Sequence, residues 1–132
     1  MLEGARLPEI EGVETEARSP FATNPDHVLR ADAVLLLTTE NLGYMSGALK
    51  DFFDRSYYPL LDQTDALPYA LLIRAGQDGT GTRRAVTSIT TGLRWKEIHE
   101  PTICRGPWTP EFLSQTKDLG TYLAAGLEAG IS

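Results

Sequence analysis

The chain has little of what would tie it to a disulfide scaffold or a metal centre. It contains a single cysteine, Cys104, so no disulfide can form within one chain and the core cannot depend on oxidation. Its two histidines, His27 and His99, have no cysteine or carboxylate partner at the spacing of a metal site. We therefore expect no metal, a buried cysteine that packs as a small apolar side chain, and a reducing compartment such as the cytoplasm.

Long apolar segments and an excess of positive charge are also missing. The longest apolar run covers residues 33–37, far short of the roughly 20 residues that cross a bilayer. The first residues carry no basic stretch followed by an apolar one, so no secretory signal is expected. The formal net charge is -6, and affinity for phosphate backbones needs clustered cations. We predict a protein that binds neither membranes nor nucleic acid.

What the chain does have is the composition of an ordinary folded domain. Hydrophobic residues make up 42% of the sequence and charged residues 23%, which is typical of globular proteins. A length of 132 residues is enough for one hydrophobic core. We expect residues 1–132 to form a single domain.

Strand-like and helix-like segments alternate along the chain. Residues 31–38 and 69–75 are apolar runs of strand length, typical of strands buried on both faces of a parallel sheet. Residues 46–60, and the segment that carries Val86 and Leu93, have the apolar stripe of amphipathic helices. Such alternation implies right-handed crossovers, so we predict an α/β fold with a mostly parallel sheet and helices on both faces.

Shorter segments complete the pattern. Residues 1–7 resemble the end of a helix stopped by proline, and residues 13–17 alternate apolar and polar side chains as an edge strand does. The sequences Asn-Pro-Asp at 24–26 and Thr-Pro-Glu at 109–111 are typical helix starts, with a capping side chain, a proline and an acid. A weak strand is predicted at residues 98–104.

Two loops are candidates for a binding site. Residues 38–46 (TTENLGYMS) and 75–81 (AGQDGTG) each follow a predicted strand, and parallel sheets bind ligands at the carboxyl ends of their strands. Their glycines permit close approach of a flat ring to the backbone, although glycine in such loops also serves simply to make a turn. Neither loop has the spacing of a Walker motif or a dinucleotide fingerprint. Arg83 and Arg84 follow the second loop, either as contacts for an anionic nucleotide or as a solvated face.

The amino-acid sequences of these two loops resemble those of one protein family. Residues 37–55 are similar to the pattern G-T-P-x-x-x-G-x-M-S-G-x-L-K-x-F-x-D-R of flavodoxin-like NAD(P)H-dependent FMN reductases and quinone reductases. The similarity continues through RAGQDGTG at 74–81 and covers about residues 28–127. Two positions depart from the pattern, because Leu37 and Thr39 stand where the family has glycine and proline.

The resemblance implies a flavodoxin-like three-layer sandwich that binds FMN and passes electrons from NAD(P)H to a quinone or similar small acceptor. In that family the two loops enclose the flavin ring with backbone groups, and the cofactor does the redox chemistry, so no catalytic side chain is expected. By position, the ring would be lined by Thr39, Glu40, Asn41, Leu42, Gly43, Tyr44, Ala75, Gly76, Gln77 and Gly79. Glu40 either accepts a hydrogen bond from the ring or is solvated, and Tyr44 either stacks on the ring or packs on its own scaffold.

Part of the family pattern is absent. Met1 aligns inside the family's first helix, so the domain is N-terminally truncated relative to the family and lacks its central first strand and phosphate-binding loop. Each charge-assisted hydrogen bond to a phosphate contributes roughly 1.5 to 3 kcal/mol, so we expect weak FMN binding or none.

The missing strand has a further consequence for the sheet. Without it, the strand at 33–37 has an open edge, and open edges recruit another strand or another chain. We expect either residues 13–17 to pair there or an intermolecular contact, and hence a homo-oligomer. Two other functions stay open: a flavodoxin-type electron carrier, or a cofactor-free domain that serves interaction or oligomerisation.

Overall fold

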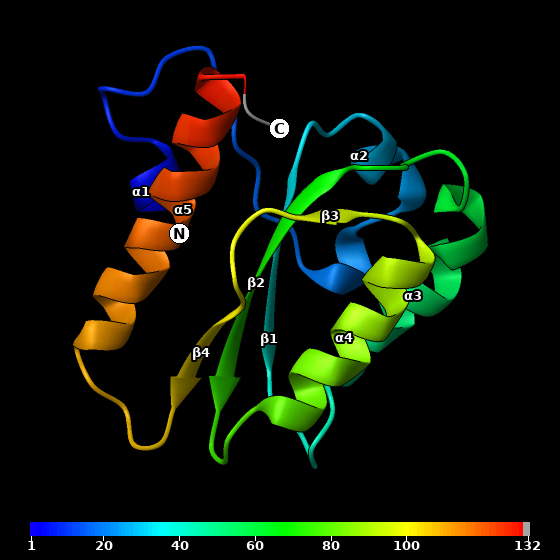
Figure 1. Ribbon diagram of the computed structural model, residues 1–132, viewed down its shortest axis with the longest axis vertical. Helices are drawn as coiled ribbons and strands as arrows, with labels where there is room; N and C mark the ends of the chain where they lie inside the picture. Colours follow the sequence, from blue (N-terminus) through cyan, green and yellow to red (C-terminus); the bar gives the residue numbers. More distant parts are fainter. Residues whose placement is uncertain (131–132) are drawn as a thin grey trace.

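A computed structural model describes residues 1–130, and in it helices lie on both faces of a parallel sheet (Figure 1). The helical elements are α1 (Leu2–Ala5), the 3-10 turn η1 (Pro20–Ala22), α2 (Pro25–Leu29), α3 (Gly47–Leu60), α4 (Thr80–Gly92) and α5 (Glu111–Glu128). The strands are β1 (Val34–Thr39), β2 (Pro68–Ala75), β3 (Lys96–Glu97) and β4 (Thr102–Arg105). The predicted α/β alternation is confirmed.

β2 is the centre of the sheet, and every strand pairing is parallel. β1 pairs along one side of β2, with Val34 opposite Tyr69 and Thr39 opposite Arg74. β3 and β4 pair along the other side, so they form one interrupted strand. The interruption contains Pro101, which has no amide to donate to a ladder, and this splits the strand predicted at 98–104.

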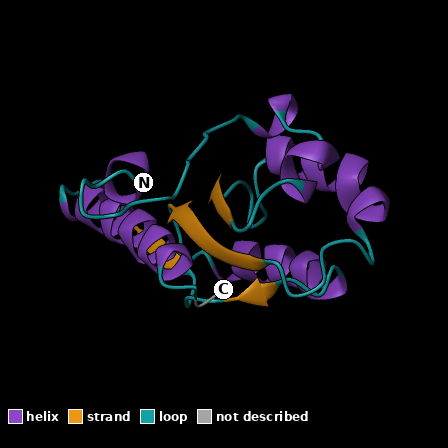
Figure 2. Ribbon diagram, turned by 90° about the horizontal axis from the view of Figure 1, so that it is seen from above, coloured by secondary structure: helices purple, strands orange, loops and turns teal. Residues whose placement is uncertain are grey.

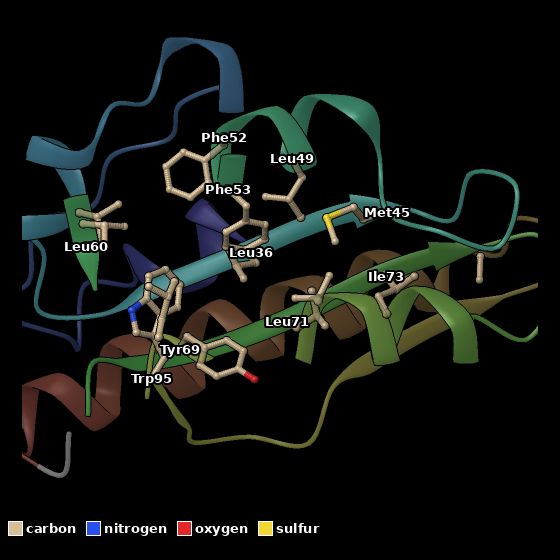
Figure 3. Packing of buried hydrophobic residues seen from close by; sticks show 14 residues of the cluster. Leu36, Met45, Leu49, Phe52, Phe53, Leu60, Tyr69, Leu71, Ile73 and Trp95 are labelled. Atoms are coloured by element: carbon tan, nitrogen blue, oxygen red, sulfur yellow. The ribbon is translucent and has the colours of Figure 1, made fainter. Parts of the chain in front are cut away.

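The main core lies between the sheet and the pair α3 and α4 (Figure 3). Leu36 of β1 and Leu71 and Ile73 of β2 meet the stripe of α3, which includes Phe52 and Phe53. Each fully buried side chain of this size contributes about 1.5 to 3 kcal/mol through the hydrophobic effect. The amphipathic helix predicted at 46–60 is therefore confirmed, with the predicted face inward.

A smaller core lies on the opposite face, under α5 and α1 (Figure 2). Leu72 of β2, Cys104 of β4 and Leu119 of α5 are buried there together. α1 packs against α5 so closely that a Cβ on Gly4 would lie 2.0 Å from the carbonyl oxygen of Lys117. The N-terminal helical segment and the buried cysteine are thus both confirmed.

The expectation that both apolar runs are buried on both faces is right for β2 and wrong for β1. In β1, Leu36 and Thr38 are buried, but Leu37 on the other face is 53% exposed. α5 packs against β2 and β4, whereas β1 lies at the side of the sheet beyond it. The strand was predicted to start at residue 31 but begins at Val34. Ala31 is not available to the strand, because its amide donates to the carbonyl of Val28 at the end of α2.

The edge strand predicted at residues 13–17 is wrong, because this segment has no strand pairing. Its middle is held instead by the Arg6 guanidinium, which donates to the hydroxyl of Thr15 at 2.5 Å and to the Thr15 carbonyl at 2.7 Å. Farther on, Arg55 of α3 donates to the carbonyl oxygens of Pro20 and Thr23. The side chains that anchor this linker thus lie outside the sheet, and β2 is the only strand that pairs with β1 within residues 1–130.

The helix starts follow the predicted capping chemistry in part. Asn24 Oδ1 accepts from the amides of Asp26 and His27, and His27 Nδ1 accepts from the Asn24 amide, which completes a capping box. Ser46 Oγ caps α3 through the amide of Leu49. α5 begins at its predicted proline and acid, but the Thr109 side chain makes no capping bond there.

Candidate functional site

Three loops leave the sheet at the carboxyl ends of β1, β2 and β4 (Figure 1). Because these strands are parallel, the loops at 40–46, 76–79 and 106–110 lie along the same edge of the sheet. The first two are the predicted binding loops. The third was not predicted as part of the site, although the Gly-Pro turn at 106–107 after a predicted strand could have indicated it.

The first loop is built around a tight turn. The amide of Asn41 donates to the carbonyl of Tyr44 at 2.8 Å, and the amide of Tyr44 donates back to Asn41 at 2.9 Å. Both central residues have positive φ, 51° at Leu42 and 78° at Gly43, which is the signature of a type I′ turn. Thr39, which stands at the family's proline position, donates from its hydroxyl to Asn41 Oδ1 at 2.8 Å. Hydrogen bonds thus order the loop without that proline.

Buried polar contacts anchor this turn to the scaffold. The buried hydroxyl of Thr38 accepts from the Ser46 amide at 2.9 Å and so closes the base of the loop. On the other side, the Thr82 hydroxyl of α4 donates to the Tyr44 carbonyl at 2.9 Å. Because Thr82 and Thr38 are almost fully buried, these bonds are shielded from water and hold the turn in place.

Glu40 joins the first loop to the second. Its Oε1 accepts from the Gln77 amide and its Oε2 accepts from the Gly79 amide, both at 2.8 Å. Both carboxylate oxygens of Glu40 are therefore engaged by the backbone, a structural role that neither predicted alternative included. A contact between Glu40 and a ring stays a prediction.

Glycine allows the two loops to touch. A Cβ on Gly81 would lie 2.4 Å from the carbonyl oxygen of Gly43, so only glycine fits at that position. Gly43 and Gly76, by contrast, have nothing within 4 Å of where a Cβ would be, which leaves open space above their backbone. The predicted juxtaposition of the two loops is confirmed.

The second loop is also tied to the third. Arg105 Nε donates to the Asp78 carbonyl at 2.7 Å, and the Gly106 amide donates to the Ala75 carbonyl at 2.9 Å. The Asp78 carboxylate accepts from the Thr80 amide at 2.9 Å, and this hydrogen bond, helped by Arg105, lowers the pKa of Asp78.

Apart from Glu40, which is half-buried, the ten predicted ring-lining residues fall into two groups. The side chain of Ala75 points into the main core, and Gly79 is buried, so these two support the loops from beneath. The exposed members are Thr39, Asn41, Leu42, Gly43, Tyr44, Gly76 and Gln77. Within residues 1–130, the amides of Leu42, Gly43 and Gly76 donate no hydrogen bond. The exposed edge thus combines free backbone donors with open space, an apolar side chain and an aromatic ring.

The remaining candidates have structural partners. His27 serves the cap of α2, and the His99 ring packs edge-on against Tyr122 at 4.8 Å. Burial raises the pKa of the Cys104 thiol, which lies in the smaller core. Among residues 1–130, no three His, Cys, Asp or Glu side chains are grouped to hold a metal ion. The helices in this part of the chain are all too short or too polar to cross a membrane.

An open hollow runs along the outer side of α4. It is lined by Thr80, Arg83, Arg84, Thr87, Ser88 and Thr91. Arg83 lies 3.9 Å from Glu100, a weak ion pair at the surface. Because Thr80 directly follows the second loop, the hollow begins next to the candidate site.

Comparisons with known proteins identify the fold. No protein-family model matches the chain, and no curated protein sequence matches it. Among solved structures, a cysteine-to-serine mutant of the flavodoxin from Pseudomonas aeruginosa matches with a TM-score of 0.71 and 18% identity. The match covers 96% of this chain and 87% of that one. A cysteine-to-alanine mutant of the same flavodoxin matches over the same shares with a TM-score of 0.67. The chain therefore has a flavodoxin-like fold.

Proposed function

We propose that the chain binds the flavin ring of FMN at the edge formed by residues 39–44 and 76–79 and serves as an electron carrier. The observation that carries this proposal is the pair of glycine-containing turns at neighbouring strand ends, locked together by Glu40. The likeness to flavodoxins supports it through the fold.

The exposed edge fits a planar ring with hydrogen-bond acceptors along one side. The free amides of Leu42, Gly43 and Gly76 are donors for such acceptors, and the space above Gly43 and Gly76 lets a ring approach the backbone. Tyr44 is 40% exposed and offers an aromatic face for offset stacking. FMN would supply the redox chemistry, while these residues would hold the ring and exclude water from one of its sides.

The charge of the two turns predicts which part of FMN matters. Residues 38–46 and 75–81 contain no lysine or arginine, so neither turn offers a cation to the phosphate. We therefore expect ring contacts to carry the affinity, and riboflavin to bind within a few-fold of FMN.

Flavin titration tests the proposal. FMN and riboflavin are added to the protein, and quenching of flavin fluorescence reports binding. Gly76→Val fills the open space above the second turn without a backbone clash, so it should abolish quenching and leave the melting temperature unchanged. Ala17→Val is the control, because Ala17 is exposed in the linker and its φ is not positive. Absence of quenching by either flavin at millimolar concentration would contradict the proposal and favour a cofactor-free interaction domain.

The hollow along α4 supports a second candidate, an NAD(P)H-dependent reductase of quinones or similar small acceptors. Arg83, Arg84 and the hydroxyls beside them offer a positive surface for an anionic nucleotide next to the flavin edge. Steady-state oxidation of NADH and NADPH with a quinone separates the candidates. A reductase would turn over and lose activity in Arg84→Ala, whereas a carrier would oxidise neither nucleotide while still binding flavin.

A further inference from the structure

The outer edge of β1 has backbone groups without partners. The Glu40 amide donates to the Arg74 carbonyl, and the register pairs Thr39 with Arg74, so even-numbered residues of β1 direct their backbone groups toward β2. Leu35 and Leu37 therefore point their N–H and C=O groups away from the sheet. Within residues 1–130 these groups have no hydrogen-bond partner.

The side chains of this edge do nothing to prevent pairing. Proteins protect open edges with charged side chains, proline or bulges, and β1 (VLLLTT) has none of these. Leu37, which is 53% exposed, presents apolar surface beside the unpaired groups. This edge is uncharged and apolar and has free backbone donors and acceptors. It is therefore complementary to another extended strand that is also uncharged and apolar.

We propose that a second copy of the chain occupies this edge, with the two β1 strands antiparallel about a twofold axis at Leu37. In a twofold antiparallel pairing, residues whose backbone N–H and C=O groups point outward must lie opposite each other. In β1 these are the odd-numbered residues, so each must lie opposite an odd-numbered residue of the second copy. In this register Leu35 lies opposite Thr39 of the second copy, and the two exposed Leu37 side chains meet on one face.

Charge selects this register over its neighbour. An axis at Leu36 would also pair odd residues, but it would place Asp32 opposite Glu40 of the second copy, and like charges directly opposite are destabilising. With the axis at Leu37, Val34 lies opposite that glutamate and no two charges oppose each other. The same number of strand residues overlaps in both registers, so the charges decide.

The linker between α1 and η1 passes close to this edge (Figure 2). Figure 2 shows it passing beyond β1, on the side away from β2. No hydrogen bond joins residues 12–18 to β1 in the described chain, and its Glu16–Arg18 ion pair is internal to it. Docking of a second copy therefore moves the linker aside without breaking a bond to the sheet.

Sedimentation equilibrium of the full chain tests the interface. The unmodified chain should dimerise, and Leu37→Lys should raise the dimer dissociation constant by about tenfold or more, because it places two like charges face to face at the axis. Leu42→Lys is the matched control, since Leu42 is fully exposed in the turn and lies off the paired edge, and it should leave the dimer intact.

Two further measurements separate this edge from any other interface. Mixing Leu37→Lys with Leu37→Asp should restore a heterodimer, because opposite charges then meet at the axis. The amides of Leu35 and Leu37 should gain hydrogen-exchange protection as protein concentration rises. A monomeric unmodified chain at high concentration would overturn the proposal, and so would a dimer that tolerates Leu37→Lys.

Discussion

At the scale of single residues, the first turn carries backbone strain at Leu42. A left-handed conformation costs roughly 1 to 2 kcal/mol for an ordinary side chain, and Leu42 has a φ of 51° with its side chain in solvent. Leu42→Asn creates the Asn-Gly pair that type I′ turns favour, so the free energy of unfolding should rise by about 1 kcal/mol in urea denaturation. Gly43→Ala should lower it, since φ is 78° there. Equal stability of all three proteins would show that the turn is not strained.

Gly81 tests the contact between the two loops. Alanine would favour the helix by about 1 kcal/mol, but its Cβ would lie 2.4 Å from a backbone carbonyl of Gly43, which cannot move as a side chain could. Gly81→Ala should therefore be destabilising by about 1 to 3 kcal/mol, as overpacked sites are. Gly76→Ala, where the Cβ meets open space, serves as the control and should change the midpoint of thermal unfolding very little.

Asp78 gives the second loop a pH dependence. Its pKa is lowered mainly by the hydrogen bond from the Thr80 amide, so the ionised form stabilises the fold. That contribution is present at neutral pH and is lost as the pH falls through the lowered pKa, below the ordinary value of 3.8. In Asp78→Asn, the fall in stability with acid should be shallower than in the unmodified chain. Identical acid profiles by circular dichroism would contradict this assignment.

At the scale of elements, Glu40 connects the end of β1 to the start of α4. Glu40→Gln keeps the length of the side chain but replaces one acceptor oxygen with a donor, so one of the amides of Gln77 and Gly79 loses its partner. The loss should be about 1 kcal/mol, because the site is only partly buried. Glu14→Gln in the linker is the control for loss of charge alone, because Glu14 is exposed. Urea denaturation compares the two variants. Equal losses of stability would show that the Glu40 hydrogen bonds do not stabilise the contact between the two loops.

Local chemistry made most elements predictable. The starts of α2 and α3 follow from capping side chains at Asn24 and Ser46, and the inward face of α3 follows from the spacing of its apolar residues. The edge strand at 13–17 was wrong because alternation alone cannot supply a partner strand, and Arg6 offers the segment another anchor. Apolar content likewise could not show that only one face of β1 is well covered.

At the scale of the whole molecule, the flavodoxin-like fold brings three loops to one edge of the sheet. Two of them were predicted from glycine content and family resemblance, and their contact through Glu40 and Gly81 agrees with a shared site. The loop at 106–110, with Trp108 60% exposed, is the part that sequence patterns missed. Its place depends on the pairing of β4 with β2, which a weak, interrupted strand does not indicate.

The sequence by itself determined the order of strands and helices, their approximate ends and the class of fold, because capping and periodicity act between residues a few positions apart. Only the tertiary structure decided that Glu40 binds amides 37 and 39 residues away, that residues 13–17 pair with no described strand, and that Leu37 is exposed on one face of β1. These features depend on which distant segments meet, and that choice is made by packing of the whole core.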